Sequence, residues 1–166
     1  QQTINHQVFL NPLEVNFMST HVGGNGLMLN DLFAGVDILT CNDDQGNYFI
    51  PSFGINQIGE YDISEGYHVF LDNSDSEVLE FEGLSQSNTT ITINDSQINY
   101  VPYLLSECVS PDQIFGEYLN DILIVKSDNG GYYVPSFDIM TLTDMCPGEA
   151  YEVVLFGMDD IVFEYP

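Results

Sequence analysis

The stretch DILTCNDDQGNYFIPSFGI (residues 37–55) occurs again 84 residues later as DILIVKSDNGGYYVPSFDI (residues 121–139). The match continues without a gap over residues 37–81 and 121–165, where 17 of 45 positions are identical. Chance would give roughly two or three identities, so the chain contains an internal repeat. We therefore expect the fold to consist of two copies of one module.

Similarity extends more loosely upstream, where residues 15–17 (VNF) correspond to residues 98–100 (INY). These matches divide the chain into a first module, residues 1–84, and a second module, residues 85–166. The joint between them is the short polar segment SQSN, residues 85–88. A linker this short predicts that the modules pack together rather than swing freely.

Each module is predicted to be mainly β, with about six short strands and one short helix. Apolar and β-branched runs between turn residues predict strands at 8–10, 15–18, 37–41, 48–50, 66–71 and 78–81. The second copy repeats them at 91–93, 98–105, 122–125, 132–134, 150–156 and 161–165. Asn30 or Asp31 is expected to cap a helix over residues 32–36. Ser110 followed by Pro111 is expected to open the matching helix.

The charge balance is extreme, with 26 acidic residues, one base (Lys126) and a net charge of −25. Such a surface repels phosphate backbones and anionic lipid, so we expect no nucleic-acid partner. No apolar run reaches the roughly 18 residues of a membrane span, so no membrane insertion is expected. Self-repulsion of this size favours a saline setting, where salt screens the charges or divalent cations bridge them. The chain begins with Gln1, which favours a processed product or an excerpt of a longer chain.

The loop NDDQGN, residues 42–47, is the best candidate for a cation site. It lacks the glycine spacing and the final glutamate of an EF-hand, so a hairpin turn is the simpler interpretation. Asp44 and Asp128 occupy equivalent positions in the two copies, which makes Asp43, Asp44 and Asp128 weak surface ligands for calcium. No other cofactor is expected.

The three cysteines have different expected fates. Cys41 aligns with Val125 in an apolar strand, so a buried free thiol is predicted there. Cys108 and Cys146 lie in loops of the second module. An oxidising exterior favours a bridge between them, and the alternative is that both remain free thiols.

No catalytic residue is expected. Glu65 and Glu149 recur at equivalent positions, but the acid and base of a hydrolase need unlike environments. Neither the zinc motif HExxH nor the nucleophile motif GxSxG occurs. Tyr48, Tyr132 and Tyr133 lie on the repeated hairpin, where outward-facing rings would suit sugar stacking or a protein interface. Core packing is the alternative role for these tyrosines.

The order of motifs resembles a tandem repeat common in large secreted and cell-surface proteins of marine Bacteroidetes, often exported by type IX secretion. The resemblance covers nearly the whole chain. The first copy carries it in Asn16, Phe33, DILTCNDDQGN (37–47), YFIPSFGINQIG (48–59) and SEGYHVFL (64–71). The second copy carries it in Asn99, Phe115, DILIVKSDNGG (121–131), YYVPSFDI (132–139) and PGEAYEVVL (147–155). The tryptophans usual in that family are absent, and Thr143 replaces a glycine. The resemblance implies extracellular or cell-surface placement and no known enzymatic activity.

These observations predict a non-enzymatic structural or adhesive module. The expected partners are further copies of itself, in a surface assembly or filament, or other surface proteins. The alternative is a carbohydrate-binding module of a secreted protein, in which surface tyrosines and carboxylates hold a glycan.

Overall fold

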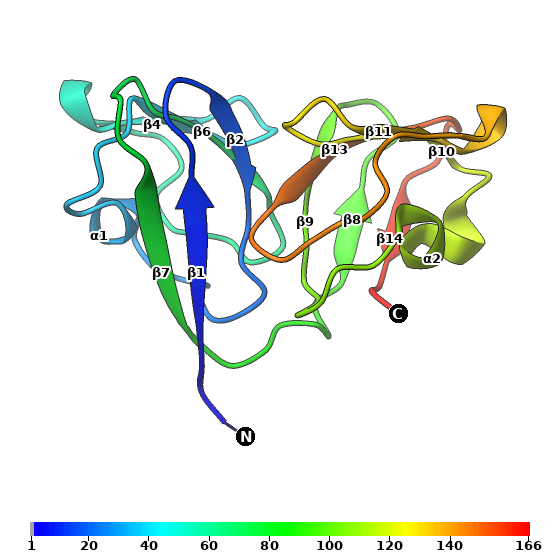
Figure 1. Ribbon diagram of the computed structural model, residues 1–166, viewed down its shortest axis with the longest axis horizontal. Coiled ribbons are helices and arrows are strands. Elements are labelled where there is room, and N and C mark those ends of the chain that lie inside the picture. The colour runs from blue at the N-terminus through cyan, green and yellow to red at the C-terminus, as the bar shows by residue number, and fades with distance from the viewer. Residues whose placement is uncertain (1) are drawn as a thin grey trace.

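A computed structural model describes residues 2–166 and shows a mainly β fold built from two modules (Figure 1). The first contains β1 (Ile4–Leu10), β2 (Val15–Met18), α1 (Leu29–Leu32), β3 (Thr40–Asn42), β4 (Tyr48–Ile50), η1 (Pro51–Phe53), β5 (Ile55–Asn56), β6 (Tyr67–Phe70) and β7 (Glu77–Gly83). The second contains β8 (Ile91–Ile93), β9 (Asn99–Pro102), α2 (Pro111–Phe115), η2 (Gly116–Tyr118), β10 (Ile122–Lys126), β11 (Tyr132–Val134), η3 (Pro135–Phe137), β12 (Ile139–Met140), β13 (Ala150–Leu155) and β14 (Ile161–Phe163).

The two modules share one topology. In the first, β1 pairs with β7 as a two-stranded ribbon, and a five-stranded sheet has the order β2-β6-β3-β4-β5. In the second, β8 pairs with β14, and the sheet has the equivalent order β9-β13-β10-β11-β12. The expected mainly β fold of two repeated modules is confirmed. Each module has seven strands rather than six, because the two-residue strands β5 and β12 pair with the returning arm of the hairpin.

A single hydrophobic core runs through both modules, because the buried apolar side chains form one connected cluster. Alternation along the ribbon supplies part of it: Val8 and Leu10 of β1 are buried, and Phe9 between them is exposed. Tyr67 and Tyr151 occupy equivalent buried positions, as predicted. The Tyr67 hydroxyl accepts a hydrogen bond from the N–H of Asp62 (2.9 Å), and the Tyr151 hydroxyl accepts one from the N–H of Cys146 (2.7 Å).

Asn16 and Asn99 form the same buried hydrogen-bond network in each module. The Asn99 side chain accepts a bond from the N–H of Asn94 (2.9 Å) and donates to the carbonyls of Asn94 (3.0 Å), Gln97 (3.2 Å) and Val153 (3.1 Å). Asn16 makes four matching bonds with the first module's backbone. Each asparagine thereby ties a turn to the strand beside it.

The helix of the first module differs from the sequence prediction. α1 spans Leu29–Leu32 and not residues 32–36, and no side chain caps it. Burial of Leu29 and Leu32 sets its position, which outweighs the capping preference of Asn30 and Asp31. α2 begins at Pro111 directly after Ser110, as predicted, but the Ser110 side chain makes no capping hydrogen bond.

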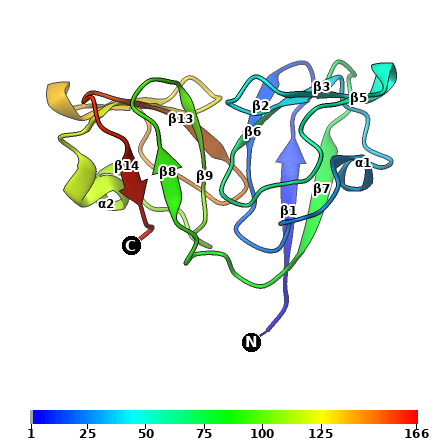
Figure 2. The same cartoon turned by 180° about the vertical axis from the view of Figure 1, so that it is seen from behind.

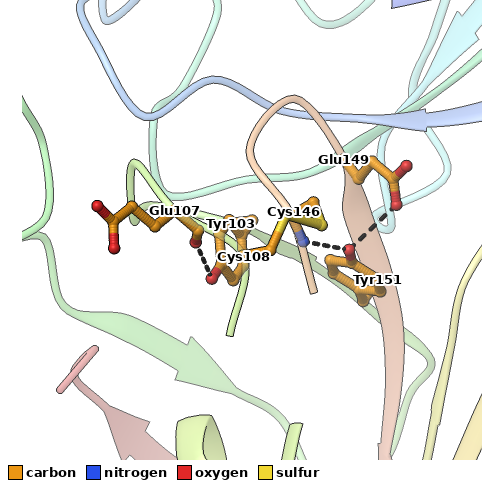
Figure 3. The surroundings of a disulfide bond; sticks show 6 residues. All are labelled: Tyr103, Glu107, Cys108, Cys146, Glu149 and Tyr151. Carbon is orange, nitrogen blue, oxygen red and sulfur yellow. Dashed lines mark hydrogen bonds between the residues drawn. A yellow bond between two sulfur atoms is a disulfide. The ribbon is translucent and has the colours of Figure 1, made fainter. Parts of the chain in front are cut away.

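The cysteines form the predicted disulfide and the predicted free thiol. Cys108 and Cys146 form a disulfide, with Cα atoms 4.2 Å apart (Figure 3). Cys41 is a free, buried thiol on β3. Within residues 2–166 no helix has the length and hydropathy needed to cross a membrane.

Candidate functional site

The modules are related by an approximate two-fold axis. Figure 2, the view from behind, shows β8, β14 and α2 where Figure 1 shows β1, β7 and α1. Contacts across the axis are reciprocal: the N–H of Tyr100 donates to Asp44 Oδ2, and the N–H of Phe17 donates to Asp128 Oδ2, both at 2.9 Å. Each module therefore covers the edge strand of the other, β2 or β9, with a carboxylate from its hairpin turn.

An aromatic stack lies at this axis. The His68 ring is sandwiched between Phe17 (ring centroids 4.0 Å apart) and Tyr100 (3.7 Å), with interplanar angles of 2° and 10°. Glu152, the repeat equivalent of His68, places Oε1 3.6 Å from His68 Nε2, and Lys126 Nζ lies 3.8 Å from Glu152 Oε2. We call Phe17, His68, Tyr100, Lys126 and Glu152 the axial cluster. It brings aromatic and charged side chains of both modules together at the junction.

The axial cluster is held by stacking rather than by a histidine ion pair. Burial lowers the pKa of His68 to about 4, so the ring is neutral at pH 7. Among residues 2–166, His68 Nε2 has no hydrogen-bond partner, and 3.6 Å from Glu152 is too long for one. A neutral, buried, tightly stacked imidazole has no access to substrate, so it is poorly placed for proton transfer.

The backbones approach closely beside this stack. The N–H of Gly66 donates to the carbonyl of Tyr100 (2.9 Å), and a Cβ on Gly66 would lie 2.6 Å from the Cβ of Ala150. Ala150 is the repeat equivalent of Gly66, so the two residues meet across the axis. On the other side, the N–H of Ser19 donates to the Gly148 carbonyl (3.2 Å). The second module lacks the equivalent hydrogen bond, because Pro102, the residue that corresponds to Ser19, has no N–H.

Sequence reasoning did not find the axial cluster, although a signal for it exists. Residues near a two-fold axis contact their own equivalents, so identical large or like-charged residues there would clash or repel. The copies differ at such positions: Gly66 opposes Ala150, and His68 opposes Glu152. Divergence between the repeats marks the positions where a residue meets its own equivalent, whereas Asp44 and Asp128, which bind the opposite edge strands, are identical.

The carboxylates proposed as calcium ligands have structural partners. Asp43 Oδ1 accepts bonds from the N–H groups of Gln45 (3.0 Å) and Asn47 (2.9 Å), which closes the hairpin turn. Asp44 and Asp128 bind backbone amides of the opposite module. Within residues 2–166, no three His, Cys, Asp or Glu side chains converge as metal ligands would. A calcium ion would have to share oxygens that already accept hydrogen bonds.

Glu65 and Glu149 lie beside the junction in similar surroundings. Burial and the carboxylates of Asp44, Asp62 and Asp43 raise the pKa of Glu65 to about 8. Burial and Asp128 likewise raise the pKa of Glu149. Both shifts have the same sign and the same kind of cause, whereas a hydrolase needs one carboxyl protonated and the other ionised.

Glu65 is expected to make stability fall as pH rises. With its pKa at about 8, the folded chain holds a proton that the unfolded chain loses near pH 4.5, so the free energy of unfolding decreases between these values. His6 and His68, whose pKa values burial lowers to about 4, act oppositely, but only below about pH 6.5. Urea unfolding of the wild type should therefore give lower stability at pH 8.5 than at pH 6.5.

The variant Glu65→Gln should flatten most of this slope, since an amide stays neutral throughout. Glu82→Gln, a substitution at an exposed carboxylate on β7, is the matched control and should leave the slope as it is. A slope that survives Glu65→Gln unchanged would show that another group is responsible.

The three tyrosines separate into two kinds. Tyr48 and Tyr132, at equivalent positions, are 43% and 38% exposed. The expectation for Tyr133 as a surface ligand is wrong, because its side chain is only 8% exposed. Successive side chains on β11 point to opposite faces, so Tyr133 packs inward like its equivalent, Phe49.

Comparison of the chain with protein-family models, with curated proteins and with solved structures gives no match. An assignment of function therefore depends on the chain's own residues. They show two modules joined by the reciprocal bonds of Asp44 and Asp128 and by the stack around His68.

Proposed function

We propose that this protein is a non-enzymatic structural or adhesive building block of an extracellular or cell-surface assembly. One observation carries the proposal: most of the side chains that resemble an active site, namely Phe17, His68, Tyr100 and Glu152 with Asp44 and Asp128, make contacts between the modules. Nucleophile, acid and metal-ligand chemistry would need such groups free to meet a substrate. Two modules that share one hydrophobic core suit load-bearing or scaffolding.

Three further features support an external setting. The Cys108–Cys146 disulfide is typical of oxidising compartments. The net charge of −25 suits a saline medium in which that charge is screened. The motif order resembles repeats of secreted Bacteroidetes proteins, which would place the chain at or beyond the cell surface.

Stability is expected to rise with sodium chloride up to about 0.5 M, because salt screens the repulsion among carboxylates that folding brings together. A chain of this size shifts its melting temperature by about 2–4 °C for each kcal/mol. We expect a rise of roughly 5 °C or more between about 10 mM and 500 mM salt, measured by circular dichroism. A flat melting temperature would contradict the screening argument.

A comparison of calcium with other salts distinguishes general charge screening from specific binding of calcium by carboxylates. If Asp43, Asp44 or Asp128 holds calcium, millimolar calcium should raise the melting temperature more than magnesium or sodium chloride of equal ionic strength. Equal effects of the three salts would mean that the carboxylates act only as solvated surface charge.

Self-association tests the proposed function directly. The purified full chain, in about 0.5 M sodium chloride to screen its charge, is examined by sedimentation velocity across a concentration series and by negative-stain electron microscopy. We expect species larger than 18.6 kDa that grow with concentration. A chain that stays monomeric at every concentration, and forms no ordered species on the microscope grid, would contradict a self-associating role.

A carbohydrate-binding role is the second candidate, favoured by the exposed rings of Tyr48 and Tyr132. Exposed tyrosine faces can stack on sugar rings. Screening against a glycan array, followed by titration of Tyr48→Ala and Tyr132→Ala, tests it. Saturable binding that both variants weaken would support this role, and binding unaffected by either would reject it.

A further inference from the structure

Each module exposes one phenylalanine at an equivalent position. Phe53 and Phe137, at the ends of η1 and η3, are 75% and 72% exposed. Both belong to the repeated segment PSF, and in both copies the next residue, Gly54 or Asp138, turns the chain with a positive φ of 65° or 52°. A left-handed turn at an aspartate carries strain, so the second copy maintains the protruding phenylalanine at a cost.

An uncharged hollow lies beside each phenylalanine. The hollow of the first module has a volume of about 330 Å³ and is lined in part by Phe33, Phe49 and Ile55. That of the second has about 310 Å³ and is lined in part by Tyr133 and Phe156. No acidic or basic side chain lines either hollow. Each module therefore presents an exposed phenylalanine beside an uncharged recess that apolar and neutral polar side chains line together.

The same segments avoid charge in a chain that is otherwise strongly acidic. Residues 48–59 contain no charged residue, and residues 132–143 contain only Asp138, although the chain carries 26 acidic residues. Two copies with a net charge of −25 each repel one another over most of their surfaces. They can approach most easily where these neutral segments meet.

The segments that carry the two phenylalanines lie far apart. Figure 1, drawn with the longest axis horizontal, shows the short coils η1 (cyan) and η3 (orange) at opposite ends of the molecule. The two-fold relation between the modules places the repeated segments alike at both ends, whereas the hollows share only two pairs of equivalent lining residues, Phe49 with Tyr133 and Pro51 with Pro135. We call residues 48–59 and 132–143, with the adjoining hollows, the two ends.

We infer that copies of this protein join end to end, with Phe53 or Phe137 of each copy entering the hollow of the next. This inference rests on the proposed self-association and names the surface responsible for it. A reciprocal junction between two ends is complete with two copies, but each copy has a second end that remains free for a further copy, so open chains result. A phenylalanine buries about 150–250 Å² on insertion, and two phenylalanines are exchanged at each junction. The resulting assembly is a linear filament one molecule wide.

The test compares single-end and double-end variants of the full chain in about 0.5 M sodium chloride, again to screen the charge. The wild type should form chains whose average mass rises with concentration. Phe53→Ser and Phe137→Ser each leave one working end and should stop at dimers. The double variant should remain at 18.6 kDa, and added single variant should shorten wild-type chains by capping them.

Phe9→Ser is the matched control, because Phe9 is 66% exposed but lies on the ribbon strand β1. It should assemble like the wild type, and all variants should melt near the wild-type temperature because the replaced rings are exposed. If the double variant assembles like the wild type, the end-to-end inference is overturned while self-association stands. If the wild type itself stays monomeric, both fail.

Discussion

Reduction of the Cys108–Cys146 disulfide should lower the free energy of unfolding by about 4 kcal/mol, the loop-entropy value for a separation of 38 residues. The bridge fixes the segment before α2 to the loop that enters β13. It lies beside Tyr103, whose hydroxyl donates to the carbonyl of Glu107 (2.6 Å), and beside the bond between Cys146 and Tyr151 (Figure 3). Urea unfolding with and without reductant measures the loss.

Among the residues that the structure describes, the first module has no disulfide at the equivalent place. There the matching segments are joined only by backbone bonds, such as Tyr61 N–H to the carbonyl of Leu27 (2.7 Å). The double variant Cys108→Ala/Cys146→Ala should reproduce the effect of reductant and should no longer respond to it. Thiol titration of the unfolded wild type should find one free thiol, Cys41. Three free thiols, or a loss below about 1 kcal/mol, would contradict the expected effect.

Replacing Asn99 with alanine should cost about 3–4 kcal/mol, because four backbone groups lose their partner and those that remain buried stay unsatisfied. Asn99→Asp should be at least as harmful, since a carboxylate would face three carbonyl oxygens without a donor. Asn16→Ala should behave like Asn99→Ala because its network is the same. Equilibrium unfolding in urea gives the values.

Asn88→Ala provides the reference for these substitutions. Asn88 is exposed in the segment between the modules, and its replacement should change stability by no more than about 0.5 kcal/mol. If Asn99→Ala behaved like Asn88→Ala, the buried asparagine networks could not be organising the turns.

The repeat made most of the fold predictable from sequence. Both copies share one topology, so a hairpin predicted in one copy supported the prediction of the same hairpin in the other. Strands such as β4 and β11 begin and end where the motif YxxPSF places them. Short strands escaped prediction: β5 and β12 have only two residues each, too few for any periodic pattern. The position of α1 also depended on tertiary burial, which outweighs local capping preference.

The junction between the modules was not predictable in the same way. The reciprocal bonds of Asp44 and Asp128 join residues more than 50 positions apart, and nothing local marks an aspartate in a turn as a cap for a distant strand. The outward tyrosines were only partly predictable. Tyr132 and Tyr133 are adjacent and chemically identical, so which of them faces solvent depends on strand register.

The two-fold axis between the modules also implies that modules of this kind occur in even numbers. An interface in which each partner offers the same face is complete with two members and has no site left for a third. Further copies of this module in a longer chain would therefore have to be added in twos. An odd copy would leave an uncovered edge strand and an unpartnered half of the stack. Duplication and fusion of a gene for a self-pairing single module would produce such a molecule, and positions such as His68 and Glu152 could then become different.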